Sequence, residues 1–365
     1  MSEWQTFCLK DLVKIFGGST PPTNNPKNYG NKIRWITAKD LSTLQGRYIE
    51  KGSRSISRLG FKSCSTFLLP KHAILFSVRA PIGYTTIISK RSCTSQGLMG
   101  LVPNKKIYFE FLYYLLKYHK NNISNMGVGT TFKGISKPAL GLFEVKIPPT
   151  YYEQQKIART LSILDQKIEN NHKINELLHT LAYKIYEYYF KYKPKNAKLE
   201  QIIIENPKSS IMVKNAQKTQ DKYPFFTSGD NILSYPKAII DGRNCFLNTG
   251  GNAGIKFYVG KASYSTDTWC ICANEFSDYL YLLLSSIKNH INQSFFQGTS
   301  LKHLQKNLLK KYPIYMPSAH EIKKFNQIIM PLLTLISINT RTSKKLEQIR
   351  DFLLPLLLKQ QVKPQ

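Results

Sequence analysis

Acidic residues are scarce in this chain of 365 residues: 22 Asp and Glu stand against 52 Lys and Arg, giving a formal net charge of +30. Such an excess predicts a polyanionic partner, either nucleic acid or an anionic membrane surface. An apolar run near the roughly 20 residues that span a bilayer is also missing. The first residues show no charged segment followed by an apolar stretch, so no secretory signal is evident. We therefore expect a cytoplasmic protein that makes no membrane contact.

Cysteines are also few, and the six are scattered without the density of a disulfide framework or the spacing of a zinc site. The seven histidines form no metal-ligand pattern, and no nucleotide-binding loop of the form Gly-x4-Gly-Lys-Ser/Thr is present. Glu144 and Lys146 match half of a nuclease signature, but no acidic residue lies between Glu110 and Glu144 to complete it. The sequence thus predicts no catalytic residues, no metal ligands and no cofactor bound by this chain.

The positive charge is concentrated in two parts of the chain. Residues 1–150 carry 22 basic and 6 acidic residues, and residues 194–318 carry 15 and 8. Residues 151–193 carry only 7 and 5, and residues 319–365 carry 8 and 3. No acidic residue lies between Glu50 and Glu110, a stretch with ten Lys and Arg. So many basic residues without counter-charges favour a surface that follows phosphates over an ordinary solvated face.

The sequence contains an internal repeat. Residues 129–137 (GTTFKGISK) recur as residues 298–306 (GTSLKHLQK), and the Pro-x-x-x-Glu of residues 149–153 recurs as residues 317–321. A period of about 170 residues is too long for a solenoid unit, so it indicates a duplicated domain.

The two copies differ in length at one place. Asp40 in the first copy matches Asp230 in the second, and Gly83 matches Gly254. The number of residues between the members of a pair is larger for the aspartates than for the glycines. The second copy is therefore shorter by about 19 residues in this window, which overlaps the acid-free stretch of the first.

Short β-branched and aromatic runs, such as residues 73–78, 84–88 and 98–102, predict strands. Each copy ends in a heptad-like pattern of nearly 40 residues, which predicts a long helix. The alternative is an amphipathic helix packed on its own domain, but two matched helices favour mutual packing. The expected seam residues are Ile157, Leu161, Leu164, Ile168, Asn171, Leu178 and Ile185 in the first helix, and Phe325, Ile329, Leu332, Ile336, Asn339, Leu346 and Leu353 in the second.

Five segments of the chain form an ordered set of motifs: residues 17–21 (GGSTP), 33–41 (IRWITAKDL), 129–136 (GTTFKGIS), 147–158 (IPPTYYEQQKIA) and 353–357 (LLPLL). Together with the duplication, this set resembles the DNA-specificity (S) subunit of type I restriction–modification enzymes, over essentially the whole chain. The second copy departs from the pattern, since residues 321–323 (EIK) replace Glu-Gln-Gln.

The resemblance implies an α+β fold with two duplicated mixed α/β target-recognition domains, each reading one half of a split site in double-stranded DNA. Two long antiparallel coiled-coil helices would separate them, in a pseudo-two-fold arrangement, and bind two methyltransferase subunits that restriction subunits join. S-adenosylmethionine, ATP and Mg²⁺ would be used by those partner subunits. The expected domains are residues 1–150, 194–318 and the spacer helices 151–193 and 319–365.

Two alternative functions remain: a single-chain methyltransferase or nuclease with an unrecognised active site, and a stand-alone DNA-binding regulator. Incubating the chain alone with DNA and labelled S-adenosylmethionine separates the first of these from a non-catalytic subunit.

The residues that contact DNA are the hardest to predict. Contacts to base edges determine which sequence is recognised, whereas contacts to phosphates only place the protein on the DNA. Our DNA-binding candidates are Ser19, Thr20, Lys51, Arg54, Arg58, Lys62, Arg79, Thr131 and Lys133 in the first domain, and Asn248, Thr249, Asn252, Lys256, Ser300 and Lys302 in the second.

Overall fold

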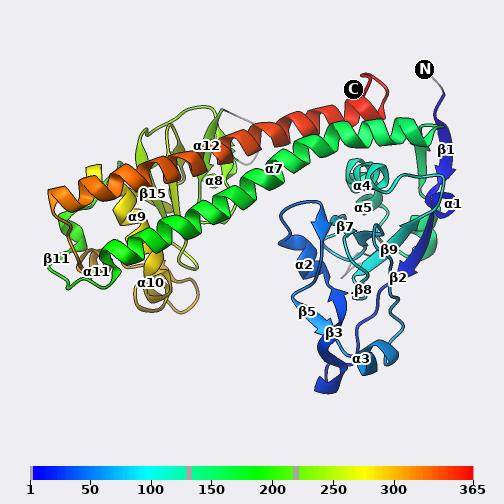
Figure 1. Ribbon diagram of the computed structural model, residues 1–365, viewed down its shortest axis with the longest axis horizontal. Coiled ribbons are helices and arrows are strands. Elements are labelled where there is room, and N and C mark those ends of the chain that lie inside the picture. The colour runs from blue at the N-terminus through cyan, green and yellow to red at the C-terminus, as the bar shows by residue number, and fades with distance from the viewer. Residues whose placement is uncertain (1–2, 129–133, 217–221, 365) are drawn as a thin grey trace. The chain divides into compact units, whose positions relative to one another are not determined.

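The computed structural model describes residues 3–128, 134–216 and 222–364. The chain divides into two compact units: unit 1 comprises residues 1–170 and 343–365, and unit 2 comprises residues 171–342. Two long helices, α7 (Tyr151–Tyr186) and α12 (Ala319–Leu358), each contribute residues to both units (Figure 1). The predicted α+β organisation, with two mixed domains and two long helices, is confirmed.

Unit 1 contains a five-stranded sheet with the order β2-β9-β6-β7-β4 and a three-stranded sheet with the order β5-β3-β8. In the small sheet β3 pairs antiparallel with β5 and parallel with β8. A further two-stranded pair, β1 with β10, leads into α7. The strands are β1 (Gln5–Cys8), β2 (Val13–Gly17), β3 (Tyr29–Ile36), β4 (Tyr48–Ile49), β5 (Arg54–Ile56), β6 (Ile74–Ser77), β7 (Thr85–Ile88), β8 (Cys93–Thr94), β9 (Leu98–Pro103) and β10 (Glu144–Ile147).

Short helices complete unit 1. Helix α4 buries nearly all of its apolar side chains in the main core of the unit, which also takes in Ile157 and Leu161 of α7 and Leu357 of α12. The helices of this unit before α7 are α1 (Leu9–Leu12), α2 (Ala38–Ser42), α3 (Arg58–Lys62), α4 (Phe109–Tyr118), α5 (Lys120–Asn125) and α6 (Lys137–Gly141), with a 3-10 turn at Pro26–Asn28.

Unit 2 repeats this topology. Its larger sheet has the order β12-β18-β15-β16 and its smaller sheet the order β14-β13-β17, in which β13 again pairs antiparallel with one neighbour and parallel with the other. The strands are β11 (Ala197–Lys198), β12 (Ile204–Glu205), β13 (Tyr223–Phe226), β14 (Leu233–Tyr235), β15 (Arg243–Asn248), β16 (Ile255–Val259), β17 (Ser263–Tyr264), β18 (Thr268–Cys272), β19 (Phe296–Gln297), β20 (His303–Leu304) and β21 (Pro313–Ile314).

The remaining helical elements of unit 2 also follow the first copy, since α9 occupies the position of α4 after the last strand of the larger sheet. The hydrophobic core of unit 2 contains side chains of α9 and of both long helices, among them Ala182 and Phe325. These elements are the π-helical turn Glu187–Lys191, the 3-10 turns Leu199–Gln201 and Asn274–Phe276, and the helices α8 (Val213–Ala216), α9 (Ser277–Ser286), α10 (Lys288–Ser294) and α11 (Lys306–Lys310).

The length difference between the copies falls at one edge of the larger sheet. In unit 1 this edge is β4, whose Tyr48 and Ile49 pair parallel with Ile87 and Ile88 of β7. Among the described residues of unit 2, β16 is the edge strand and has no such neighbour. The longer first copy therefore uses part of its additional residues for an extra edge strand.

The repeated Pro-x-x-x-Glu segment marks the start of each long helix. Thr150 accepts a hydrogen bond from the Glu153 backbone N–H (3.2 Å), and Ser318 accepts one from the Glu321 backbone N–H (3.4 Å). The Glu321 carboxylate in turn accepts from the Ser318 N–H (2.9 Å), which completes a capping box. In both copies a proline directly precedes the capping residue, and a strand of the unit ends within a few residues before it, so the repeat encodes the same strand-to-helix junction twice.

Within each unit the segments of α7 and α12 lie side by side and antiparallel (Figure 1). In unit 1 Asp165 is bonded to Arg350, and Leu161 shares a core with Leu354. In unit 2 the Asn339 amide donates to the Asn175 Oδ1 (2.9 Å). Every expected seam residue is buried or half-buried. The helices thus pack on each other and on their own domains at once.

Leu161 offers a test of this shared core. It is fully buried among residues of α4, α7 and α12, so Leu161→Ala leaves a cavity and should lower the free energy of unfolding by about 2–5 kcal/mol. The matched control is Leu177→Ala on the same helix, where the side chain is 70% exposed and the effect should stay within about 0.5 kcal/mol. Urea denaturation measures both; equal effects would contradict the burial of Leu161.

Candidate nucleic-acid interface

The same hairpin tip is built in both copies. In unit 1 the Ser77 hydroxyl at the end of β6 donates to the Pro81 carbonyl (2.9 Å), and in unit 2 the Asn248 amide at the end of β15 donates to the Asn252 carbonyl (3.1 Å). Each bond joins a strand end to the residue four positions on. The glycine-rich segment 250–254, which connects the paired strands β15 and β16, contains the second of these tips.

In unit 2 three further segments converge on this tip. The Gly251 N–H donates to the Lys302 carbonyl (2.9 Å) and the Leu304 N–H to the Thr249 carbonyl (3.0 Å), so residues 298–304 lie alongside it. The Thr249 N–H donates to the Ser228 hydroxyl (3.2 Å), and the Thr249 hydroxyl donates to the Asp267 carbonyl (2.8 Å). Ser300, Lys302 and Asn252 are exposed beside this cluster. The structure thus brings together the predicted contacts of the second domain.

The equivalent cluster in unit 1 is centred on Arg79. This exposed arginine forms an isolated β-bridge with Gly134, just as Gly250 does with His303 in unit 2. The Val78 N–H next to it donates to the Gly97 carbonyl (3.0 Å). Thr131 and Lys133, two of the predicted DNA contacts, lie outside the described residues.

Ser19 and Thr20 are half-exposed on the turn that follows β2. The Ser19 N–H donates to the Thr94 carbonyl (2.9 Å), and its own carbonyl accepts from the Trp35 indole N–H (3.2 Å). A Cβ on Gly18 would lie 2.0 Å from the Ser95 carbonyl oxygen, so only glycine fits there. Gly18 therefore lets the turn pass close to the residues at the end of β8.

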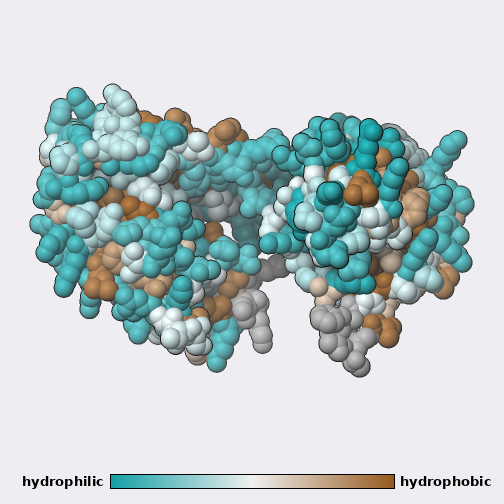
Figure 2. Space-filling model, turned by 90° about the horizontal axis from the view of Figure 1, so that it is seen from below, coloured by the Kyte–Doolittle hydropathy of each residue, from teal (hydrophilic) through white to brown (hydrophobic). Residues whose placement is uncertain are grey.

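The predicted basic group of unit 1 lies on the small sheet and the helix beside it. Arg54 belongs to β5, where its guanidinium stacks 4.1 Å from the centre of the Tyr29 ring. Arg58 and Lys62 lie on α3, and Lys51 lies between β4 and β5. All four side chains are exposed. The visible face of each unit in Figure 2 is mainly hydrophilic, with hydrophobic residues in small separate patches.

Two of the predicted contacts are used inside the second domain instead. The Lys256 ammonium donates to the Thr227 carbonyl (2.9 Å) and to the Asn248 Oδ1 (3.1 Å). Asn248 is buried, and burial lowers the pKa of Lys256 below its ordinary value. Lys256 and Asn248 therefore join the hairpin tip to the segment after β13. This internal role of Lys256 could not be inferred from the sequence alone.

Asp40 holds the corresponding segment of unit 1. Its carboxylate accepts hydrogen bonds from the Thr37 N–H (2.8 Å), the Thr37 hydroxyl (2.7 Å) and the Ser53 N–H (2.8 Å). Burial alone raises the pKa of Asp40, but the bonds from Ser53 and Thr37 outweigh it, and the pKa lies below its ordinary value. In unit 2 the Thr227 hydroxyl accepts from the Gly229 N–H (3.0 Å) at the matching turn.

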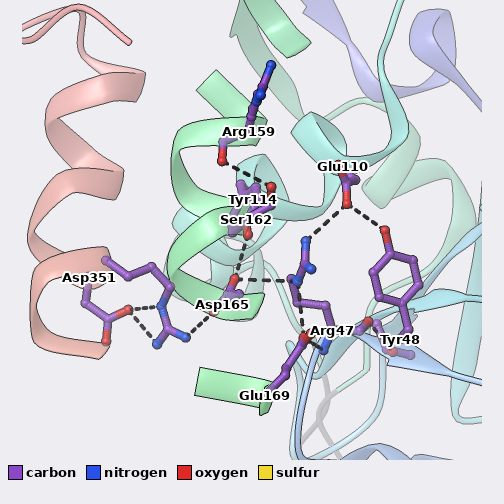
Figure 3. A network of polar contacts seen from close by, with 11 residues as sticks. Arg47, Tyr48, Glu110, Tyr114, Arg159, Ser162, Asp165, Glu169 and Asp351 are labelled. Carbon is purple, nitrogen blue, oxygen red and sulfur yellow. Dashed lines mark hydrogen bonds and ion pairs between the residues drawn. The ribbon is translucent and has the colours of Figure 1, made fainter. Parts of the chain in front are cut away.

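Sequence reasoning missed a charged cluster in unit 1 that is largely withdrawn from solvent. Arg47, Glu110, Asp165 and Glu169 meet between α4, α7 and the segment before β4 (Figure 3). One signal was present: Arg350, which is bonded to Asp165, occupies an otherwise apolar heptad position. A charge in a seam indicates a buried partner, although it does not identify that partner.

Across residues 3–128, 134–216 and 222–364, no group of three or more His, Cys, Asp or Glu side chains could hold a metal ion. Within the same ranges, no helix is both long and apolar enough to cross a membrane. All six cysteines are free thiols.

Fold and site together define a class: a protein built from two copies of a basic α+β domain, each continued by a long helix, with its exposed loops gathered at equivalent hairpin tips. The family model described as "Type I restriction modification DNA specificity domain" matches residues 1–180 and 195–348. The chain belongs to this type I restriction–modification DNA-specificity family, as the sequence resemblance predicted. As a specificity subunit, it is the recognition component of such a system and not a catalytic one.

Known relatives agree over nearly the whole length. The chain is 29% identical to the type I restriction enzyme MjaIX specificity subunit of Methanocaldococcus jannaschii, over 98% of this chain and 93% of that protein. It is 24% identical to a putative type I specificity subunit of Mycoplasma genitalium, over 84% and 80%. A crystal structure of a type I restriction–modification S subunit from M. genitalium superposes with a TM-score of 0.63 at 18% identity, covering 97% of this chain and 96% of that one. The latter likeness shows the shared fold.

Asp40→Asn tests the loop described above. The asparagine amide has only one acceptor oxygen, so its N–H₂ group would face a backbone N–H or hydroxyl donor and at least one hydrogen bond would be lost. The free energy of unfolding should therefore fall by about 1 kcal/mol at pH 7. Because the folded pKa of Asp40 is lowered, its contribution is complete above the unfolded value near 3.8 and is lost as the pH falls through the folded value. The difference in urea midpoint between variant and parent should therefore shrink as the pH falls below 3.8. Glu275→Gln, at an exposed carboxylate, is the control, and a pH-independent difference would contradict the assignment.

Proposed function

We propose that this chain directs the methyltransferase and restriction subunits of a type I complex to a bipartite target in double-stranded DNA. Each mixed domain reads one half of the target through the loops gathered at its hairpin tip. The observation that carries this proposal is the duplication of that tip, with the bridges Arg79–Gly134 and Gly250–His303 at matching positions. Two equivalent loop clusters in one chain suit a site with two separate halves.

The charge distribution supports two different contributions to DNA binding. Exposed lysines and arginines of the small sheet in unit 1 supply contacts to phosphates, which are independent of sequence. The tip residues Arg79, Asn252, Ser300 and Lys302 are positioned on loops that can enter a groove and meet base edges. Lys256 and Asn248 support these loops from within.

The long helices supply the spacing and the docking surface. In this proposal residues 1–150 and 194–318 form the DNA-contacting domains, while residues 151–193 and 319–365 form the spacers. Ile174, Leu177 and Leu181 are exposed on α7 at intervals of three and four residues, which places them on one helical face. We assign this face to one of two methyltransferase subunits. Those subunits bring S-adenosylmethionine, and the restriction subunits bring ATP and Mg²⁺, in the cytoplasm.

The basic group provides the first test of DNA binding. Replacing Lys51, Arg54, Arg58 and Lys62 by Gln should flatten the dependence of log affinity on log salt by up to about 0.9 for each phosphate that is no longer bound. Affinity should fall about equally for target and unrelated duplexes. Fluorescence anisotropy over a salt series measures both quantities. Lys90→Gln is the control, because Lys90 is already bonded to Glu50 (2.6 Å). An unchanged slope would mean that the basic group faces solvent.

Helix length provides the second test. Inserting one heptad at corresponding places in α7 and α12 lengthens each helix by about 10 Å while keeping the apolar seam in register. The unread stretch between half-sites should grow by about three base pairs at 3.4 Å per base pair. Methylome sequencing of cells that carry the parent or the lengthened chain reveals the accepted spacing. The same spacing with both chains would refute a spacer role for the helices.

A further inference from the structure

We propose that Arg47 and Arg243 are positioning residues that clamp each DNA-reading domain to the long helix following it, and that these two clamps set which half-site spacing the complex accepts. The inference rests on the proposed function and deepens it, because it names residues that govern spacing without touching DNA. Each clamp lies wholly inside one unit.

In unit 1 the Arg47 guanidinium is held between the domain and α7. Its side chain is 4% exposed, with Nη1 3.1 Å from Glu110 Oε1 on α4 and Nε 3.2 Å from Glu169 Oε1 on α7. The Arg47 backbone N–H also donates to Glu169 Oε1 (2.8 Å), and Asp165 of α7 lies 4.0 Å away. One residue therefore bonds to a domain helix and to the spacer helix simultaneously (Figure 3).

The bonds continue from this arginine to the second spacer helix. Asp165 also accepts from Arg350 of α12 (2.7 Å) and from the Tyr114 hydroxyl of α4 (2.6 Å). On the other side, Glu110 accepts from the Tyr48 hydroxyl of the edge strand β4 (2.6 Å). The extra strand of the first copy, the domain helix and both spacer segments of unit 1 thus share one polar network.

Unit 2 makes the same joint with different residues. Arg243 binds the buried Asp278 of α9 through two nitrogens, each at 2.5 Å. Its remaining donors reach α12, at the Thr334 hydroxyl (3.0 Å) and the Met330 carbonyl (3.2 Å). The Val259 N–H of the edge strand β16 also donates to the Ser337 hydroxyl of α12 (3.0 Å).

The comparison of the copies indicates that the joint itself is required. Glu110 and Asp278 occupy equivalent positions in the two copies. Each is the second residue of its helix, and the distance in sequence between them equals the distance between the two Pro-x-x-x-Glu segments. The arginines do not correspond. Arg47 lies in the segment that the second copy lacks. When the copies are aligned on Gly83 and Gly254, Arg243 of the second copy matches His72 of the first. His72 stacks on the Phe109 ring instead, with ring centres 4.1 Å apart. The same contact is therefore supplied from two different places in the chain.

An arginine fork suits a positioning role. Apolar contacts hold surfaces together without a strong preference for angle, whereas a planar guanidinium bonded to carboxylates on two elements fixes their relative direction. A buried ion pair adds little net stability, but removing one partner leaves an uncompensated charge. If the site is bipartite, the angle of each domain on its helix determines how far apart the two recognised half-sites lie.

The test uses the assembled complex of this chain with its methyltransferase subunits and labelled S-adenosylmethionine. The substrates are duplexes with the native spacer, with one base pair fewer and with one base pair more, and duplexes with one substituted half-site base. Arg47→Met and Arg243→Met should each lower discrimination between spacers at least tenfold. Discrimination against the substituted base should change less than twofold. Arg159→Met, at an exposed arginine side chain of α7, is the control and should leave spacer discrimination unchanged.

Two milder variants keep the test decisive if a methionine variant does not fold. Glu169→Gln removes the charge that Arg47 meets on α7, and Thr334→Val removes the hydroxyl that Arg243 reaches on α12; both should relax spacer discrimination in the same direction. Unchanged spacer discrimination, or an equal loss of methylation on every duplex, would overturn the inference. If the parent complex itself ignores the spacer, the proposed bipartite function fails, which is a separate outcome.

Discussion

The joint between each mixed domain and its long helix is the constraint on which the rest of the structure depends. A domain that contacts DNA through exposed loops is useful only if those loops are presented in a fixed direction. In unit 1 that direction is held by the buried network of Arg47, Glu110, Asp165 and Glu169, and in unit 2 by Arg243 and Asp278. Charges withdrawn from water must be paired and hydrogen-bonded, so these contacts tolerate few alternative geometries.

The scarcity of acidic residues acquires a structural explanation from these contacts. Several of the few carboxylates already have partners within their own unit: Asp40 accepts hydrogen bonds in a loop, Glu110 and Asp165 bind Arg47 and Arg350, and Glu321 caps a helix. Of these, Glu110 and Asp165 neutralise arginines that are largely withdrawn from solvent. The exposed lysines and arginines of the small sheet in unit 1 consequently have few counter-charges, which is the condition for attracting a polyanion.

Much of the fold was predictable because its signals are local or periodic. The strands around residues 73–78, 84–88 and 98–102 follow from β-branched runs, and the long helices from heptads and a repeated cap. The clamps were not predictable, because Arg47 meets Glu110 and Glu169 across 63 and 122 residues. Lys256 shows the same limit for the site: a lysine on a glycine-rich hairpin suggests a phosphate contact, but only the packing shows that its ammonium is bonded inside the domain.

The two copies keep one frame and attach it differently, and this has a consequence for how such a chain can change. Equivalent hairpin tips and sheet orders mean that either domain can alter its loops without disturbing its core. The two clamps, in contrast, use arginines at non-equivalent positions, Arg47 in unit 1 and Arg243 in unit 2. A substitution of either arginine leaves the contacts of the other intact. In our proposal the residues that read bases lie on the loops at the hairpin tips, whereas the arginines that orient the domains contact the long helices. Under this proposal target sequence and target spacing vary independently, because the two roles belong to different residues.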